Sequence, residues 1–206
     1  GWATLLVATS VMPVMVFSAI SAHYDPRRID TLFASHQDPD IISSLSLWLN
    51  FNPDLKCYLS WLWSGFIPHF GGDDQTFLKI PDKGMDLELG NLKLQAVPAH
   101  YLHSSGNFNL YDPKAKILFS GDVGAALLPQ GEDYLFVKDF DSHIRFAEGF
   151  HKRWMGSNEA KNQWCERVSR LDIDMLCPQH GAIYQGADVK RFIDWFHNLQ
   201  VGQMMD

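Results

Sequence analysis

A single hexapeptide, Ser35-His36-Gln37-Asp38-Pro39-Asp40, concentrates side chains that can bind a metal ion. His36, Asp38 and Asp40 are spaced i, i+2 and i+4, and in an extended segment these three side chains share one side. Pro39 favours extended backbone at Asp38. Asp-Pro-Asp is also good turn chemistry, so the hexapeptide by itself favours an ordinary polar turn over a metal site.

Three further segments favour the metal-binding interpretation, because each places a histidine or an aspartate in a small-residue turn after an apolar strand. They are Val97–Asn107 with His100 and His103, Leu118–Asp122 with Asp122, and Met175–Gly181 with His180. Four strand ends that each offer a ligand fit a site built at one edge of a sheet. Each segment is a weak signal alone, and their joint occurrence in this order is a strong one.

Strands with interspersed helices must position these segments, which predicts sheets covered by helices in one domain, residues 1–206. Apolar runs predict strands at 29–35, 55–59 and 173–177, short strands within 75–97, and a hairpin of 108–111 with 117–120. Helical periodicity predicts a helix starting at Asp40 with Ile41, Leu45 and Trp48 on one face, and helices within 141–170 and at 189–200.

Residues 2–20 carry no charge, so a membrane span or a signal peptide must be weighed. No positive residue precedes the run, and Pro13 interrupts it. A buried strand at 3–8 and a helix at 12–23 with Pro13 in its first turn account for the pattern better. A start without Met and inside an apolar strand indicates a trimmed N-terminus.

The net charge of −7 disfavours nucleic acid as a binding partner, because the phosphate backbone would be repelled. The three cysteines have no CxxC spacing, which is typical of reduced thiols in a cytoplasmic protein.

The order HxDxD, H-S-S-G-N, S-G-D and P-x-H-G resembles the metallo-β-lactamase fold superfamily over nearly the whole chain. Within it, FASHQDPD, HSSGNFNLYDP and ILFSGD are most similar to the di-iron branch, which contains the flavodiiron proteins and the oxygen-binding di-iron proteins. The resemblance implies an α/β fold, an αββα four-layer sandwich. Val7–Val11 stands where members usually carry an Asp-Gly-Gly-like turn, so we expect this fold either complete or without its first strands.

The resemblance also implies a ligand set for two metal ions. His36, Asp38 and His103 would bind the first ion, Asp40 and His180 the second, and Asp122 would bridge them. Hydrolytic members typically have HxHxDH, whereas Asp38 and Ile41 replace two of those histidines here. Oxygen-rich ligation favours iron over zinc. Ile41 cannot ligate, which leaves positions on the second ion open for a small ligand such as O2 or, on zinc, for water.

Several other polar residues, most of them histidines, are not assigned as metal ligands. His103 fits the H-S-S-G turn better than His100 does, so His100 is assigned to the pocket wall, where its ring could hydrogen-bond a bound oxygen species. Tyr101 and Gln37 are assigned to the pocket wall in the same way. For all three residues, a packed or solvated side chain without a role at the metals is an equal alternative. His151 and His197 follow helical patterns and are interpreted as packed or solvated.

These features predict a non-haem di-iron protein with two Fe ions that binds O2, for sensing or for reduction as an oxidoreductase. Only 26 residues (206 − 180) follow His180, so we expect no flavin domain there and a separate electron donor or signalling partner. A di-zinc hydrolase of the same fold is the alternative, and a metal-free interaction domain is a third. We expect a cytoplasmic protein without membrane or nucleic-acid partners, and a homodimer is one form that the flavodiiron resemblance suggests.

Overall fold

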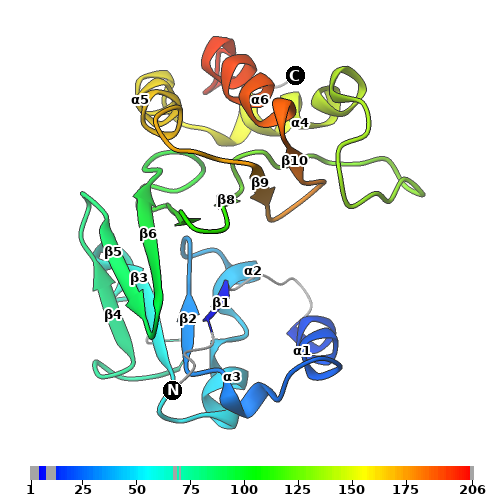
Figure 1. The fold of residues 1–206 in the computed structure, drawn as a ribbon. Coiled ribbons are helices and arrows are strands. Elements are labelled where there is room, and N and C mark those ends of the chain that lie inside the picture. Colours follow the sequence, from blue (N-terminus) through cyan, green and yellow to red (C-terminus); the bar gives the residue numbers. More distant parts are fainter. Residues whose placement is uncertain (1–4, 8–12, 67–68, 70, 205–206) are drawn as a thin grey trace. The chain divides into compact units, whose positions relative to one another are not determined.

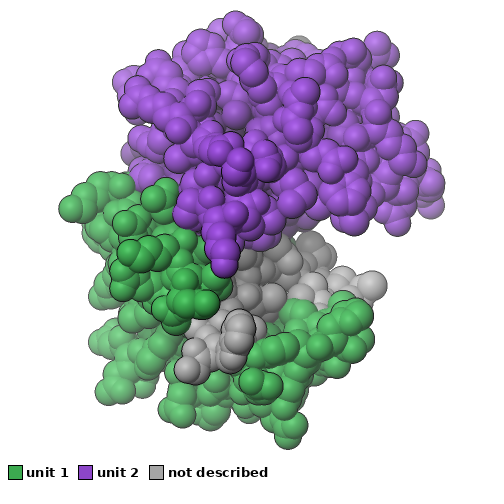
Figure 2. Space-filling view, viewed as in Figure 1, with its two compact units in different colours: residues 1–96 green, residues 97–206 purple. Residues whose placement is uncertain are grey.

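The computed structural model describes residues 5–7, 13–66, 69 and 71–204 (Figure 1). The chain divides into two compact units, residues 1–96 and 97–206, which Figure 2 colours separately. Its strands fall into two sheets. The first is contained in unit 1, and each unit has a hydrophobic core of its own.

Unit 1 is built on a parallel four-stranded sheet of order β1-β2-β3-β4. These strands are β1 (Leu5–Val7), β2 (Thr31–Phe33), β3 (Lys56–Ser60) and β4 (Phe77–Ile80). Strand β2 is buried at every position, as expected for a parallel strand covered on both faces. An antiparallel hairpin follows, formed by β5 (Met85–Leu89) and β6 (Leu92–Pro98).

The helices of unit 1 are short. They are α1 (Pro13–Ser21), α2 (Pro39–Ile42), α3 (Leu45–Phe51) and the 3-10 helices η1 (Pro26–Arg28) and η2 (Trp61–Trp63). The predicted single helix from Asp40 is therefore two helices, with a break at Ser43 and Ser44. Its predicted apolar face is confirmed, because Ile41, Leu45 and Trp48 are all buried in the core of unit 1.

The strands of unit 2 have the order β10-β9-β8-β7. They are β7 (Phe108–Asp112), β8 (Ile117–Gly121), β9 (Met175–Pro178) and β10 (Tyr184–Gln185). The predicted hairpin is confirmed by the antiparallel pairing of β7 with β8. Strand β9 runs parallel to β8, which brings the turns after these two strands to the same edge of the sheet.

Three helices lie together against the strands of unit 2 (Figure 1): α4 (Phe140–Trp154), α5 (Asn158–Val168) and α6 (Ala187–Asn198). Side-chain caps mark two of their starts, where Asp139 accepts from the amide of Ser142 and Ser157 from that of Ala160. Helix α6 buries Val189, Phe192, Ile193 and Phe196.

The uncharged N-terminal run contains β1 and α1, so the prediction of a strand and a helix is confirmed for the residues that the structure describes. Residues 1–4 and 8–12, which include parts of both predicted elements, lie outside the described residues. Within the described part of the chain, no helix has both the length and the apolar character needed to cross a membrane.

Candidate metal centre

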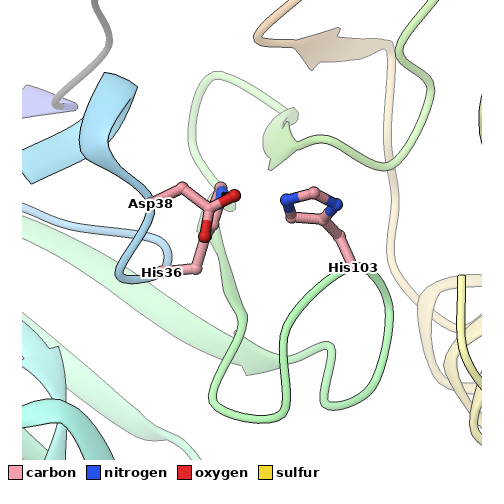
Figure 3. A group of neighbouring side chains, drawn as sticks. All are labelled: His36, Asp38 and His103. Atoms are coloured by element: carbon pink, nitrogen blue, oxygen red, sulfur yellow. Dashed lines mark ion pairs between the residues drawn. The ribbon is translucent and has the colours of Figure 1, made fainter. Parts of the chain in front are cut away.

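The six predicted ligands are divided between the two units. His36, Asp38 and Asp40 belong to unit 1, and His103, Asp122 and His180 to unit 2. Figure 3 draws three of them, His36 and Asp38 from the loop that follows β2 and His103 from the loop that follows β6.

In unit 1, the loop after β2 buries His36 completely and fixes its ring. The hydroxyl of Ser35 lies 2.9 Å from Nδ1 of His36. With Nδ1 engaged in this way, Nε2 is the nitrogen that can donate a lone pair to a metal ion, and it lies 3.8 Å from Oδ2 of Asp38. The side-chain amide of Gln37 donates to the other carboxylate oxygen of Asp38 at 2.9 Å.

Asp38 is the N-cap residue of α2, with the extended backbone that Pro39 was predicted to impose (φ −65°, ψ 149°). Its carboxylate makes no capping hydrogen bond to the helix. Asp40 lies in the first turn of α2, where the helix dipole favours negative charge. The extended arrangement of His36, Asp38 and Asp40 therefore holds only as far as Asp38, because Pro39 starts the helix.

In unit 2, the carboxylate of Asp122 lies between two histidines and is almost fully buried. Its Oδ2 is 3.4 Å from Nε2 of His103, and its Oδ1 is 3.7 Å from Nε2 of His180. These separations exceed ordinary hydrogen-bond lengths. They match the spacing of neighbouring ligand atoms around a metal with bonds of about 2.0–2.2 Å. One carboxylate that turns each oxygen to a different imidazole is the arrangement that a bridge between two ions requires.

The loop that carries His103 has a strained backbone. Tyr101 (φ 61°) and His103 (φ 73°) both lie in the left-handed region, at a cost on the order of 1–3 kcal/mol each. The buried side-chain amide of Asn107 offsets part of this cost by donating to the backbone carbonyl of Leu102 at 2.7 Å. The amide of Tyr101 donates to Ser104 O at 2.8 Å.

Aromatic rings shield His103 on the side of α4. The ring of Phe150 stacks on the imidazole with a centroid separation of 6.0 Å, and the ring of Trp154 is tilted against it at 5.2 Å. These contacts bury the histidine and limit the directions that its ring can take. A ligand held in one orientation binds metal without a further loss of side-chain freedom.

His180 follows β9 and is the most exposed ligand candidate of unit 2, with 36% of its side chain accessible. Its backbone is nevertheless fixed, since its carbonyl accepts from the amide of Ala126 at 3.2 Å. Gly181 allows this approach. It has φ 93°, and a Cβ there would lie 2.9 Å from the amide nitrogen of Ala126.

The residues assigned to the pocket wall are also located. The ring of His100 packs edge-on against Phe108 at a centroid distance of 5.0 Å. Tyr101 is exposed, with 59% of the residue accessible to solvent. Their roles toward a bound oxygen species remain predictions. Ile41, considered above as a missing ligand, is buried in the core of unit 1, so its side chain serves packing.

His151 is the residue near this site that sequence reasoning underestimated. It is fully buried in α4, and burial lowers the pKa of its imidazole to about 4. Its Nδ1 donates to the carbonyl of Ala147 at 2.8 Å, and its Nε2 accepts from the amide of Gly124 at 2.9 Å. Gly124 comes two residues after Asp122. The helical pattern predicted the packing but not this bond to the turn that carries Asp122.

Comparison with known proteins places the chain in a family. The model of the ODP family beta lactamase matches residues 8–181. The chain belongs to this family. The prediction of a metallo-β-lactamase fold and of its di-iron branch is thereby confirmed.

Solved structures support the same placement. The chain is 42% identical to the chemotaxis sensor ODP from T. denticola in its apo state, with a TM-score of 0.89 over 96% of this chain and 82% of that one. A structure described as a peroxy diiron species of chemotaxis sensor ODP gives 42% identity and a TM-score of 0.88, covering 96% and 83%. A flavo di-iron protein variant from Thermotoga maritima shares the fold, at 24% identity and a TM-score of 0.83 over 95% of this chain and 49% of that one.

Two curated proteins also match. A protein of Methanocaldococcus jannaschii is 24% identical over 191 residues, which is 87% of this chain and 46% of that protein. Diflavin flavoprotein A 1 of Synechocystis is 36% identical over 101 residues, 48% of this chain and 17% of that protein. The chain therefore spans less than half the length of these curated relatives.

Proposed function

We propose that this protein is a non-haem di-iron protein that binds O2. The observation that carries the proposal is the buried carboxylate of Asp122, whose two oxygens face two different histidines, His103 and His180. The chemistry of the donors fits iron, since three imidazoles and three carboxylates form a mixed nitrogen and oxygen set. Membership of the ODP family and 42% identity to a chain described with a diiron species support the same metal.

The ligand assignment is part of this proposal. His36, Asp38 and His103 would hold one ion, Asp40 and His180 would hold the other, and both ions would share Asp122. Two iron ions bound there would supply the electrons for binding O2. The protein contributes fixed ligands: Ser35 sets the ring nitrogen that His36 presents, and Phe150 and Trp154 fix the ring of His103.

The related chemotaxis sensor favours sensing of O2 as the role, with reduction of O2 by a separate electron donor as the oxidoreductase alternative. In both cases a second protein receives the signal or delivers electrons. We further propose a cytoplasmic protein, in keeping with three free cysteines, of which Cys57 and Cys165 are buried. A single domain of residues 1–206 and a homodimer remain predictions.

The test is to purify the protein without oxygen, to measure its metals, and to record optical spectra before and after exposure to air. We expect about two iron atoms per chain and a new visible absorption band on exposure. Two zinc atoms per chain and no response to O2 would instead support the di-zinc hydrolase. Adding a chemical electron donor separates the two roles, because only an oxidoreductase consumes O2 over many turnovers.

A further inference from the structure

His151 lies in the middle of the hydrophobic core of unit 2 and yet makes two directed hydrogen bonds. Its ring contacts the edges of Phe192 and Phe196, at centroid distances of 5.7 and 5.0 Å. The carbonyl of Ala147 can only accept a hydrogen bond, so Nδ1 of His151 carries the proton. The amide of Gly124 can only donate, so Nε2 must be the unprotonated acceptor. The two partners therefore define one neutral tautomer.

The residue that His151 holds cannot be replaced or moved easily. Gly124 has φ 99°, and a Cβ there would lie 2.9 Å from the side chain of Leu176. Its carbonyl accepts from the hydroxyl of Tyr184 at 3.2 Å. Gly124 is thus held at its amide by α4 and at its carbonyl by β10.

This anchored glycine belongs to the turn that presents Asp122. The amide of Ala125 donates to the carbonyl of Asp122 at 3.1 Å, which closes the turn. At the other end, the amide of Val123 donates to Ser120 O at 3.1 Å, where β8 finishes. The orientation of the Asp122 carboxylate, with one oxygen toward each histidine, depends on this short stretch of backbone.

We propose that His151 is a positioning residue of the metal centre, which fixes the turn from Asp122 to Ala125 through its bond to Gly124. This role rests on the proposed function, because it matters for metal binding only if Asp122 is a ligand. A residue that merely filled the core would be replaceable by an apolar side chain of similar size. A positioning residue requires a hydrogen-bond acceptor at the place of Nε2.

The test compares His151→Leu, which keeps the bulk and loses the acceptor, with His151→Gln, whose side-chain oxygen can still accept from Gly124. Val168→Ala, a core substitution elsewhere in unit 2, is the control for a general loss of stability. His151→Asn, whose amide is too short to reach Gly124, replaces the leucine variant if that variant does not fold. The two readouts are hydrogen exchange of the Gly124 amide in metal-free protein and anaerobic Fe(II) titration.

We expect the Gly124 amide to exchange at least about tenfold faster in His151→Leu than in the wild type. In His151→Gln and in the control Val168→Ala, this amide should exchange near the wild-type rate. Fe(II) affinity should fall roughly 10–100-fold in the leucine variant and recover in the glutamine variant. If His151→Leu matches the wild type in Fe(II) affinity or in Gly124 exchange, the positioning role of His151 is overturned. The proposed function is not affected by that result. A wild-type chain that binds fewer than two Fe(II) ions would overturn the proposed function as well.

Discussion

The two ligand-bearing regions of the chain are held in different ways. In unit 1, the hydroxyl of Ser35 contacts the ring of His36, and the side-chain amide of Gln37 donates to the carboxylate of the next residue, so both bonds join neighbours in the sequence. In unit 2, the turn of Asp122 is held by residues that are distant in the sequence. The bonds in unit 1 thus act within one loop, whereas those in unit 2 tie the turn of Asp122 to other elements of the fold.

The long-range support in unit 2 forms a buried chain of hydrogen bonds. The indole of Trp164 donates to the side-chain oxygen of Asn109 at 2.7 Å, and the amide of Asn109 donates to the carbonyl of Ser120 at 2.9 Å. The hydroxyl of Ser120 donates to Val123 O at 2.6 Å. Together with His151, these bonds fix both sides of Asp122.

The largest effect on Fe(II) affinity is expected at Asp122, the proposed shared ligand. Asp122→Asn replaces a shared anionic ligand by a neutral one, so Fe(II) affinity should fall by more than about 100-fold and the second ion should be lost. Anaerobic Fe(II) titration measures this change, and circular dichroism checks that the fold is kept. Two ions bound with wild-type affinity would remove Asp122 from the ligand set.

The choice between the two histidines of the loop after β6 is the next test. His103→Ala should abolish binding of one ion, whereas His100→Ala should leave two ions bound. Trp154 lies against His103, so its fluorescence should change on metal binding in the wild type and in the His100 variant only. The reverse pattern would exchange the roles of the two histidines.

The stability of unit 2 should depend on pH through His151. Burial lowers the pKa of this imidazole to about 4 from an ordinary value of 6.5, so the unfolded chain binds the extra proton first. Stability from this residue is complete above about pH 6.5 and is lost as the pH falls toward 4, by about 2–3 kcal/mol. Denaturant unfolding of metal-free protein measures the loss. His151→Gln should show a smaller decrease over that range, and an equal decrease would assign the effect to other groups.

The smallest effect is expected for the local support in unit 1. Ser35→Ala removes the hydroxyl at Nδ1 of His36, so Fe(II) affinity should fall by roughly tenfold. The loss should be smaller than for His151→Leu, since the ring of His36 stays buried without the hydroxyl, whereas the turn of Asp122 loses a bond that ties it to α4. An effect of Ser35→Ala larger than that of His151→Leu would reverse the ranking of the two regions.

The same contrast explains what could be predicted from the sequence. Apolar runs and their turns predicted the strands, and four short motifs in a fixed order predicted the family. Each run and each motif can be recognised because it lies within a few consecutive residues. The break between α2 and α3 was missed, since no glycine or proline marks it. The bond from His151 to Gly124 joins residues 27 positions apart, and no local pattern reveals such a contact. The strained φ of His103 is likewise set by the folded loop.

A chain with the six proposed ligands should hold two iron ions that respond to O2. The most direct measurement is the metal content of protein purified without oxygen, followed by optical spectra as air is admitted. We expect about two iron atoms per chain and a visible band that forms in air in the wild type and is absent in Asp122→Asn. Zinc in place of iron, or a spectrum unchanged by O2, would contradict it.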